Sequence, residues 1–458
     1  MRRILLAGVS AAAVIFTSVT PGFAQNLAFP IGEGAFSWQS LADFTASHQG
    51  LQGQELTIWS PWNNEGDATQ WESVWRYFEQ ATGVTVRAGS SPNYEEQARI
   101  DIAAGSPSNI LILPQPGLLA DFAAQGALSP LGPDVQAFIE QNYAAGPSWA
   151  SLGQFAGPDG TVAQYALAYK QETKSFVWYS PDNFAEMGYE VPTSMEALME
   201  LEAQIIADGG TPWCIGVESG GATGWAATDW IEDLMLRNYT PDVYDAWVAN
   251  EIPFNDPRVV DVINQFGRIA LNNQMVAGGT AAIAATAFGD SPLGLFTVPP
   301  QCYLHRQASF IASFFPEGTV AGEDYDFFYM PTFESKPELG SPVLGSGNLV
   351  TIALDSPAAR AFIDFLMTPI AHEIWMAAPN SAFLSALTTA NLDVYSSPAL
   401  RQQGEILTGA TTFRFDASDL MPGPIGAGAF WTGMIDFLGG RSAEAVTAQI
   451  QATWDAIK

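Results

Sequence analysis

The stretch ELTIWSPWNNEGDATQWESVWRYFEQATG, residues 55–83, decides the fold. Its apolar run from Leu56 to Trp59 is long enough for one short buried strand. Pro61 breaks that strand, and a helix capped by Asp67 or Thr69 is predicted to end at the next glycine. The apolar side chains of this helix recur on one face, at Trp71, Val74, Trp75 and Phe78.

The loop between this strand and helix combines one aromatic ring with several hydrogen-bonding groups. It carries an indole, two amides and a carboxylate, from Trp62, Asn63, Asn64 and Glu65. In open α/β sheets, ligands bind beyond the carboxyl ends of the strands, which is where this loop lies. A flat apolar face beside polar groups suits a sugar. The alternative is a packed strand–helix corner with Trp62 in the hydrophobic core, and this stretch alone leaves both open.

The chain that follows repeats the pattern of strand and helix. Residues 84–86 and 110–113 predict the second and third strands, each reached through one helix. Strands separated by single helices form a parallel sheet with right-handed crossovers. The turn after the third strand therefore places Gln115 at the same sheet edge as Trp62.

Length and composition limit the class of protein. The chain has 458 residues, 48% of them hydrophobic, which is enough for more than one domain with a large core. A net charge of −31 argues against nucleic acid or anionic lipid as a partner. Residues 1–24 have the features of a secretory signal: Arg2, Arg3, an apolar run and small residues before a cleavage site. We expect cleavage after Ala24.

The two cysteines, Cys214 and Cys302, suggest a disulfide. An exported protein meets an oxidising environment, in which two cysteines readily join. The alternative is a pair of buried free thiols.

Several longer segments, taken in order, resemble one known family. They are ELTIW (55–59), FVWYSPDNFAEMGYEVPTSMEAL (176–198), DAWVANEIPFNDPRVVDVI (245–263), GSGNLVTIALDSPAARAFIDFL (345–366) and QIQATWDAIK (449–458). With them, the chain from about residue 54 onward resembles the extracellular solute-binding proteins of ABC sugar importers, a family that includes maltose-binding proteins. Two narrower segments are similar to periplasmic alpha-glucoside-binding proteins: PWCIGVESGGATGWAATDWIEDLMLR (212–237) and PPQCYLHRQASF (299–310).

This resemblance implies an α/β fold of the periplasmic-binding-protein type. Two lobes would be joined by hinge strands, with a ligand cleft between them. We expect the chain to pass between the lobes within the strand-rich residues 165–179 and again at residues 325–331. The implied division is residues 25–52 as an N-terminal extension on the surface, 53–167 with 327–375 as the first lobe, and 168–326 with 376–458 as the second.

The resemblance also implies a function. The chain would be a periplasmic monomer that binds an alpha-glucoside such as maltose, sucrose or trehalose, and delivers it to the permease subunits of an ABC transporter. No cofactor is implied. Many relatives place an acid after the third strand, where this chain has Gln115. The implied ligand-binding residues are Trp62, Asn63, Glu65, Gln115, Tyr169, Lys170, Trp225, Asp229, Phe288, Asp290, Gly345, Ser346 and Trp431.

Two other functions stay open. A secreted glycoside hydrolase needs two carboxylates that flank one bond, and 48 acidic residues single out no pair. His48, His305 and His372 are scattered without metal-ligand spacing, and no nucleophile elbow is present, so we predict no catalytic or metal residue. A binding protein for another solute, either another oligosaccharide or a peptide, would share the architecture. A peptide site would favour charged clamps over tryptophans.

Overall fold

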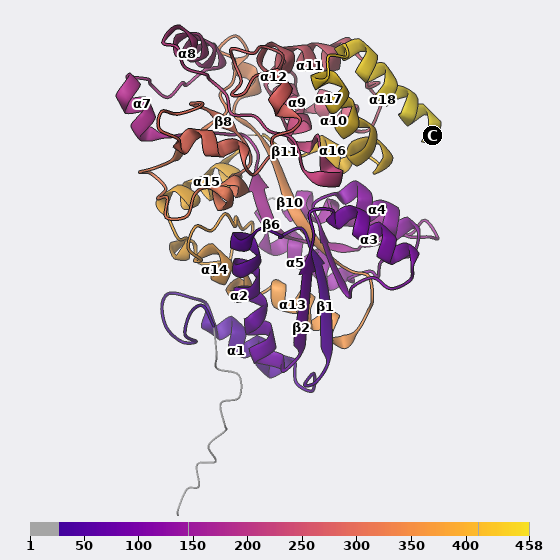
Figure 1. The fold of residues 1–458 in the computed structure, drawn as a ribbon. Coiled ribbons are helices and arrows are strands. Elements are labelled where there is room, and N and C mark those ends of the chain that lie inside the picture. The colour runs from indigo at the N-terminus through magenta and orange to yellow at the C-terminus, as the bar shows by residue number, and fades with distance from the viewer. Residues whose placement is uncertain (1–26, 145, 411, 458) are drawn as a thin grey trace, which may run out of the picture.

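The computed structural model describes residues 27–144, 146–410 and 412–457. The predicted signal segment, residues 1–24, lies outside the described residues. Within the described ranges, no helix combines the length and the apolar character needed to span a bilayer. Figure 1 shows two groups of elements, one below and one above a set of strands that connects them.

The main sheet has six strands in the order β11-β10-β3-β1-β2, with β6 paired to β10. β1 (Glu55–Ser60) runs parallel to both β2 (Thr85–Ser90) and β3 (Ile110–Leu113), which confirms the predicted parallel arrangement. β10 (Pro342–Ile352) runs antiparallel to β3 and to β6 (Ala166–Thr173), and parallel to β11 (Thr412–Phe415).

Two hydrophobic cores divide the remaining elements into two lobes. The first lobe also contains α1 (Trp38–Ser47), α2 (Glu65–Thr82), α3 (Tyr94–Ala103), α4 (Pro116–Ala124), α5 (Pro133–Asn142), α6 (Gly146–Ser151), β4 (Gln154–Ala156), β5 (Val162–Gln164), α13 (Pro357–Leu366) and α14 (Pro369–Met376). The second lobe contains β7 (Phe176–Tyr179), α7 (Pro181–Met187), α8 (Met195–Ala207), α9 (Trp225–Asn238), α10 (Pro241–Val248), α11 (Pro257–Ala270), α12 (Thr280–Ile283), β8 (His305–Arg306), β9 (Asp326–Tyr329), α16 (Ala417–Leu420), α17 (Trp431–Leu438) and α18 (Ala443–Ile457). α15 (Pro398–Gly409) packs on a small separate cluster.

The deciding stretch folds as a strand and a helix, with one change at the cap. The side chain of Asn64, rather than that of Asp67 or Thr69, caps α2, and it accepts from the backbone N–H of Asp67 at 2.8 Å. Asn caps helices as well as Asp does, so residues 65 and 66 join the first turn. The predicted apolar face of α2 is buried, and the helix ends at Gly83 with φ 72.

The chain passes between the lobes at three places. Tyr169 lies in the first core and Val177 in the second, so the segment after β6 is one crossing, as predicted. The second crossing is β10, whose Leu344 belongs to the second core and whose Leu349 belongs to the first. The third follows β11. The crossing expected at residues 325–331 is wrong, because β9 pairs with β7 inside the second lobe.

The cores differ from the expected division of the chain. Phe328 packs in the second core, and Phe383 packs in the first, although the expected boundaries put each in the other lobe. We therefore propose the three crossings as the boundaries. α1 buries Leu41 and Phe44 in the first core, so the N-terminal extension is part of that lobe and does not simply lie on its surface.

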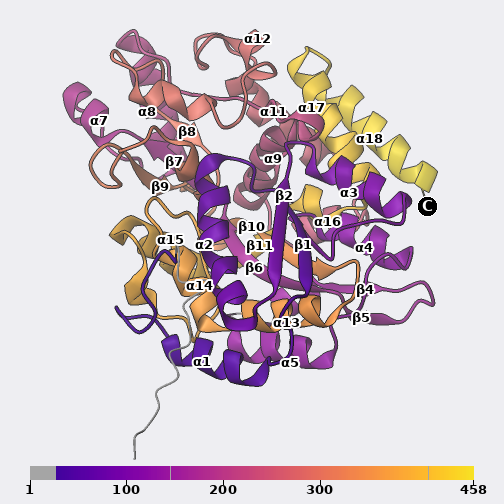
Figure 2. The ribbon, with the colours of Figure 1, turned by 60° about the horizontal axis from the view of Figure 1, so that its bottom comes forward.

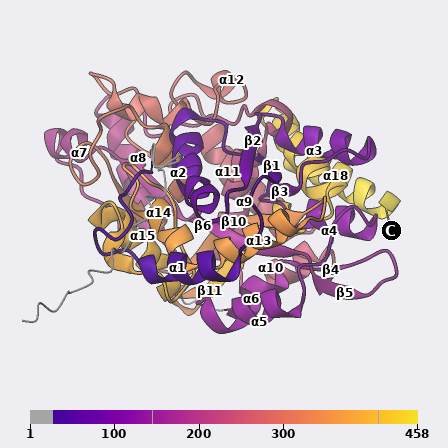
Figure 3. The ribbon, with the colours of Figure 1, turned by 90° about the horizontal axis from the view of Figure 1, so that it is seen from below.

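The helices of the first lobe lie on both sides of its sheet. Figure 2 shows α2 and α14 on one side of β1 and β2, with α3 and α4 on the other. Seen from below, α1, α5 and α13 cover the end of the first lobe, and the β4–β5 hairpin extends outward (Figure 3).

Two local features of the second lobe complete the fold. The side chain of Ser194 caps α8 and accepts from the N–H of Ala197. Residues 213–217 make only isolated bridges, through Trp213, in the described chain.

Cys214 and Cys302 form a disulfide in the second lobe, as predicted. The bond encloses a sequence separation of 88 residues and joins the segment before α9 to the segment before β8. The disulfide therefore links two segments of the second lobe that lie near the lobe interface.

We expect the double variant Cys214→Ser, Cys302→Ser to lose about 4 kcal/mol of unfolding free energy, because the unfolded chain gains the entropy of a long open loop. Urea denaturation of both proteins measures this loss. Reducing agent should lower the stability of the wild type and leave the variant unchanged; equal stability of the two proteins would contradict the expectation.

Candidate functional site

A cavity of about 480 Å³ lies between the two lobes. The first lobe contributes the loops that follow β1 and β3 and the start of α3, which are the carboxyl ends of the parallel strands. The second lobe contributes the start of α9, the turn before it and residues between 287 and 314. The hinge strands β6 and β10 and the start of α16 provide the rest.

Most of the residues predicted to bind ligand line this cavity. They are Trp62, Asn63, Gln115, Lys170, Trp225, Phe288, Ser346 and Trp431. The resemblance therefore pointed to the loops that surround the cavity. Contact of each side chain with a ligand stays a prediction.

The other predicted residues lie elsewhere. Tyr169 is fully buried in the first core, where its hydroxyl donates to a backbone carbonyl at 2.5 Å. Asp229 is buried behind the cavity wall, and Gly345 packs against an aromatic ring. Glu65 and Asp290 are exposed outside the cavity lining. Other residues of the same segments line the cavity instead, such as Lys170 next to Tyr169 and Ser346 next to Gly345.

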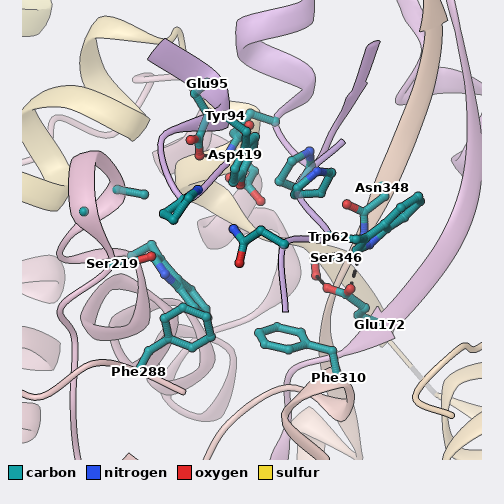
Figure 4. A pocket seen from close by; sticks show the side chains of 18 of the residues that line it. Trp62, Tyr94, Glu95, Glu172, Ser219, Phe288, Phe310, Ser346, Asn348 and Asp419 are labelled. Atoms are coloured by element: carbon teal, nitrogen blue, oxygen red, sulfur yellow. Dashed lines mark hydrogen bonds between the residues drawn. The ribbon is translucent and has the colours of Figure 1, made fainter. Parts of the chain in front are cut away.

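Aromatic rings form two walls of the cavity. Trp62 lines the first-lobe wall, and its ring packs on Trp71 and Trp375 at centroid distances of 4.8 and 4.7 Å. Trp62 is therefore a core residue that also lines the cavity, and its contact with a sugar stays a prediction. On the second-lobe wall, Trp225 lies 5.1 Å from Phe288 and 5.9 Å from Phe310. Figure 4 shows Phe288 and Phe310 on the same side of the cavity.

A carboxylate from α3 lies beside Gln115, the residue that follows the third strand by one position. Gln115 donates through Nε2 to Glu95 Oε1 at 3.1 Å, and Glu95 lies on α3. The hydroxyl of Tyr94 is hydrogen-bonded to the same carboxylate. Burial raises the pKa of Glu95, although these hydrogen bonds oppose the shift. Glu95 thus places a buried carboxylate beside Gln115 in the cavity wall.

A second polar group surrounds Lys170 on β6. Its ammonium lies 3.4 Å from Asp67 Oδ1 and 3.9 Å from Glu172 Oε1. Glu172 also accepts from Ser346 Oγ at 2.8 Å and from Asn348 Nδ2 at 3.2 Å. Figure 4 shows Glu172, Ser346 and Asn348 together at one side of the cavity. This group offers both donors and acceptors.

A third polar group surrounds Lys174, which lies between β6 and β7. Its ammonium donates to Asp229 Oδ1 at 2.8 Å and also to Asp416 Oδ2. The guanidinium of Arg306 lies 3.5 Å from the second oxygen of Asp229. Glu232 accepts from two backbone N–H groups of α16, at 3.2 and 3.1 Å. All these side chains are buried, so their charges interact strongly.

The protonation states in this third group follow from burial and from the neighbouring charges. Burial alone would lower the pKa of Lys174, but Asp229 and Asp416 raise it well above its ordinary value. Burial raises the pKa of Asp229 to about 7, against the opposing effect of Lys174. Burial and repulsion by Asp416 raise the pKa of Glu232 well above its usual range.

Asp229, Glu232 and Asp416 also have oxygens within 4.8 Å of one another, close enough to share a cation. The ammonium of Lys174 already contacts two of these three carboxylates. The geometry is that of an ion cluster with lysine as its cation.

Several cavity residues are absent from the implied ligand-binding set, although the amide of Asn64 was noted in its loop. They are Asn64, Asp67, Tyr94, Glu95, Glu172, Lys174, Glu218, Phe310, Phe314, Asn348, Asp416, Ser418 and Asp419. Asn64, Asp67, Glu172 and Lys174 lie within segments that were singled out, so strand alternation and helix spacing could have found them. Residues 416–419 carried no signal, because their place depends on how β11 pairs with β10.

Replacing Lys174 by methionine should lower the free energy of unfolding by about 3–5 kcal/mol, because Asp229 and Asp416 would be left buried without their cation. Urea denaturation measures the loss. Lys336→Met is the matched control, since this half-buried lysine hydrogen-bonds only to Asn238 among the described residues. We expect the control to lose about 1 kcal/mol. Equal losses in the two variants would contradict the role given to Lys174.

Comparison with known proteins gives one family. The model of the bacterial extracellular solute-binding proteins matches residues 62–373. The chain is 57% identical over 462 residues to the alpha-glucosides-binding periplasmic protein AglE of Rhizobium meliloti (strain 1021), with 100% of each chain covered. It is 43% identical over 377 residues to the osmoprotective compounds-binding protein GgtB of Synechocystis sp., covering 82% of this chain and 87% of the relative.

Solved structures share the fold. The bacterial solute receptor AcbH matches with a TM-score of 0.75 at 18% identity, over 88% of this chain and 99% of the receptor. RafE in complex with raffinose matches with a TM-score of 0.66 at 17% identity, over 88% and 99% of the two chains. At these identities the likeness concerns the two-lobed α/β fold. The match to the family model and the relative that aligns over its full length together show that the chain belongs to the bacterial extracellular solute-binding proteins.

Proposed function

We propose that this chain is the periplasmic substrate-binding component of an ABC transporter for alpha-glucosides, and that it holds maltose, sucrose or trehalose between its lobes. The observation that carries the proposal is the composition of the cavity wall, in which aromatic rings stand opposite polar groups. The 57% identity to an alpha-glucoside-binding protein supports the choice of sugar.

The cavity chemistry matches that of a sugar. The C–H faces of a pyranose pack on flat rings such as those of Trp225 and Trp62. Its hydroxyls need directional partners, because each buried polar group left unpaired costs about 1–3 kcal/mol. The groups around Lys170 and Glu95 offer such partners. The cavity volume of about 480 Å³ falls within the range of ordinary ligand sites.

The three interlobe crossings support binding by lobe closure. Segments at 170–176, 345–348 and 416 lie between the cores and absorb the change in backbone angles when one lobe rotates against the other. Sugar that contacts both walls stabilises the closed form, and the permease subunits recognise that form. The reaction is binding and release without covalent chemistry.

The location and assembly belong to the same proposal. The chain is exported with residues 1–24 as a signal that is cleaved after Ala24, and it acts in the periplasm as a monomer. The periplasmic relative that aligns over its full length supports this location.

A second candidate is the binding of osmoprotective compounds. The relative that is 43% identical carries that description. The two candidates differ in which class of compound binds best.

We expect maltose, sucrose or trehalose to raise the thermal midpoint of the protein. Ligand at 100 times its Kd adds about 2.7 kcal/mol to the stability of the folded state. A thermal-shift panel of disaccharides, amino acids, a tripeptide and common osmoprotectants measures the response. Stabilisation by an amino acid or peptide, and by no sugar, would overturn the proposal. The bound sugar should be recovered unchanged after incubation.

We expect Trp225→Ala to weaken sugar binding at least tenfold, or by about 1.4 kcal/mol, because the ring provides a stacking face on the cavity. Titration calorimetry measures the affinity. Trp38→Ala is the control, since Trp38 is also half-buried but lies on α1 away from the cavity. Unchanged affinity in the Trp225 variant would mean that Trp225 packs in the cavity wall and does not contribute to sugar binding.

A further inference from the structure

Two buried acids from different lobes meet at one corner of the cavity. Glu95 comes from α3 of the first lobe, and Asp419 from α16 of the second. Both line the cavity, and they are 7% and 5% exposed. Figure 4 shows Glu95, Tyr94 and Asp419 gathered at this corner. Burial raises the pKa of Asp419, repulsion by Asp416 adds to the shift, and the charge of Glu95 is near enough to contribute as well.

The backbone holds the lobes together beside this corner. A Cβ placed on Gly117 of α4 would overlap the carbonyl oxygen of Met421 and lie 3.2 Å from that of Asp419. The Asp121 carboxylate of the same helix accepts from the backbone N–H of Gly423. The two acids therefore stay close whenever the lobes are in this arrangement.

At this corner the hydrogen-bond donors are engaged, whereas some of the acceptors are free. The Nε2 of Gln115 and the hydroxyl of Tyr94 are both engaged with Glu95. The Oε1 of Gln115 is buried and has no partner in the described chain, although the residue lines the cavity. Within the same ranges, no hydrogen bond reaches the carboxylate of Asp419, whose backbone N–H donates to Asp416. The free groups at this corner are acceptors.

Two cations lie near the corner, but Lys174 is bonded to other acids and Arg99 is exposed and does not line the cavity. Lys174 acts on Asp419 over a distance, but its ammonium donates to Asp229 and Asp416. Arg99 follows Glu95 by one helical turn, and its guanidinium lies beside Asp121 at the seam between the lobes. A ligand group that enters the corner must therefore bring donors of its own.

We infer that Glu95, Gln115 and Asp419 form a donor-selecting subsite. It accepts hydroxyls of a neutral sugar, binds an ammonium group in place of a hydroxyl more tightly, and rejects a carboxylate or phosphate there. An ammonium group donates three hydrogen bonds, accepts none, and neutralises the repulsion between the two acids. The protein would then bind amino-substituted alpha-glucosides as well as neutral ones. This inference rests on the proposed function, since it assumes that sugar occupies the cavity.

The test uses the disaccharide that binds tightest, its set of monoamino-monodeoxy derivatives, the matching monodeoxy sugars and the uronic acid. Titration calorimetry at pH 7 compares them on the wild type. We expect one amino derivative to bind about tenfold more tightly than the parent sugar, the deoxy sugar altered at the same position to bind about tenfold more weakly, and the uronic acid not to bind.

Variants locate the effect at the corner. In Asp419→Asn the advantage of the amino derivative should fall to threefold or less, while the parent sugar still binds. Glu96→Gln is the matched control: it removes the same charge from the next residue of α3, which is exposed, and should keep the full advantage.

The outcomes distinguish a failure of the proposed function from a failure of the subsite. If no neutral sugar binds, the proposed function fails. If the parent binds but every amino derivative binds no better than its deoxy counterpart, the subsite is wrong and the function stands. An advantage that persists in Asp419→Asn would also overturn the subsite.

Discussion

The ion pairs of Lys174 connect two of the segments that pass between the lobes to helix α9. The lysine lies where the chain leaves β6 for β7, and its ammonium reaches Asp229 on α9 and Asp416 after β11. One side chain therefore joins two of the three interlobe crossings to the helix that carries Trp225. Because the cluster is buried, its charges must stay paired, and the second-lobe wall of the cavity is positioned by that requirement.

The cavity combines two kinds of surface, each supported differently. The ring of Trp62 is held by a group of core aromatic residues, so its face is rigid. The polar groups are held by hydrogen bonds between neighbours, such as Gln115 with Glu95 and Ser346 with Glu172. A rigid apolar face with polar groups fixed in advance lets a ligand bind without ordering the side chains first, which lowers the entropic cost of binding.

The fold could be predicted from sequence further than the site could. Apolar runs and helical spacing located β1, α2, β2 and β3, and the order of segments led to the two lobes and to Trp225. Lys174 lay in a segment that was singled out, but its role depends on contacts with residues 55 and 242 positions away. Glu95 and Asp419 are far apart in the chain, and local patterns do not reveal that two lobes bring them together. The expectation of a crossing at β9 in place of β10 has the same cause, since it is strand pairing that separates the two, and the sequence does not show which strands pair.

The contact between Gly117 and the carbonyl of Met421 has an evolutionary consequence. The close approach of α4 to residues 419–421 is set by main-chain atoms, because Gly117 has no side chain to hold them apart. Substitutions in the cavity can therefore change which solute is accepted while the spacing of the lobes at this seam stays constant. A transporter that recognises that spacing could keep its docking geometry while the receptor diverges toward new cargo.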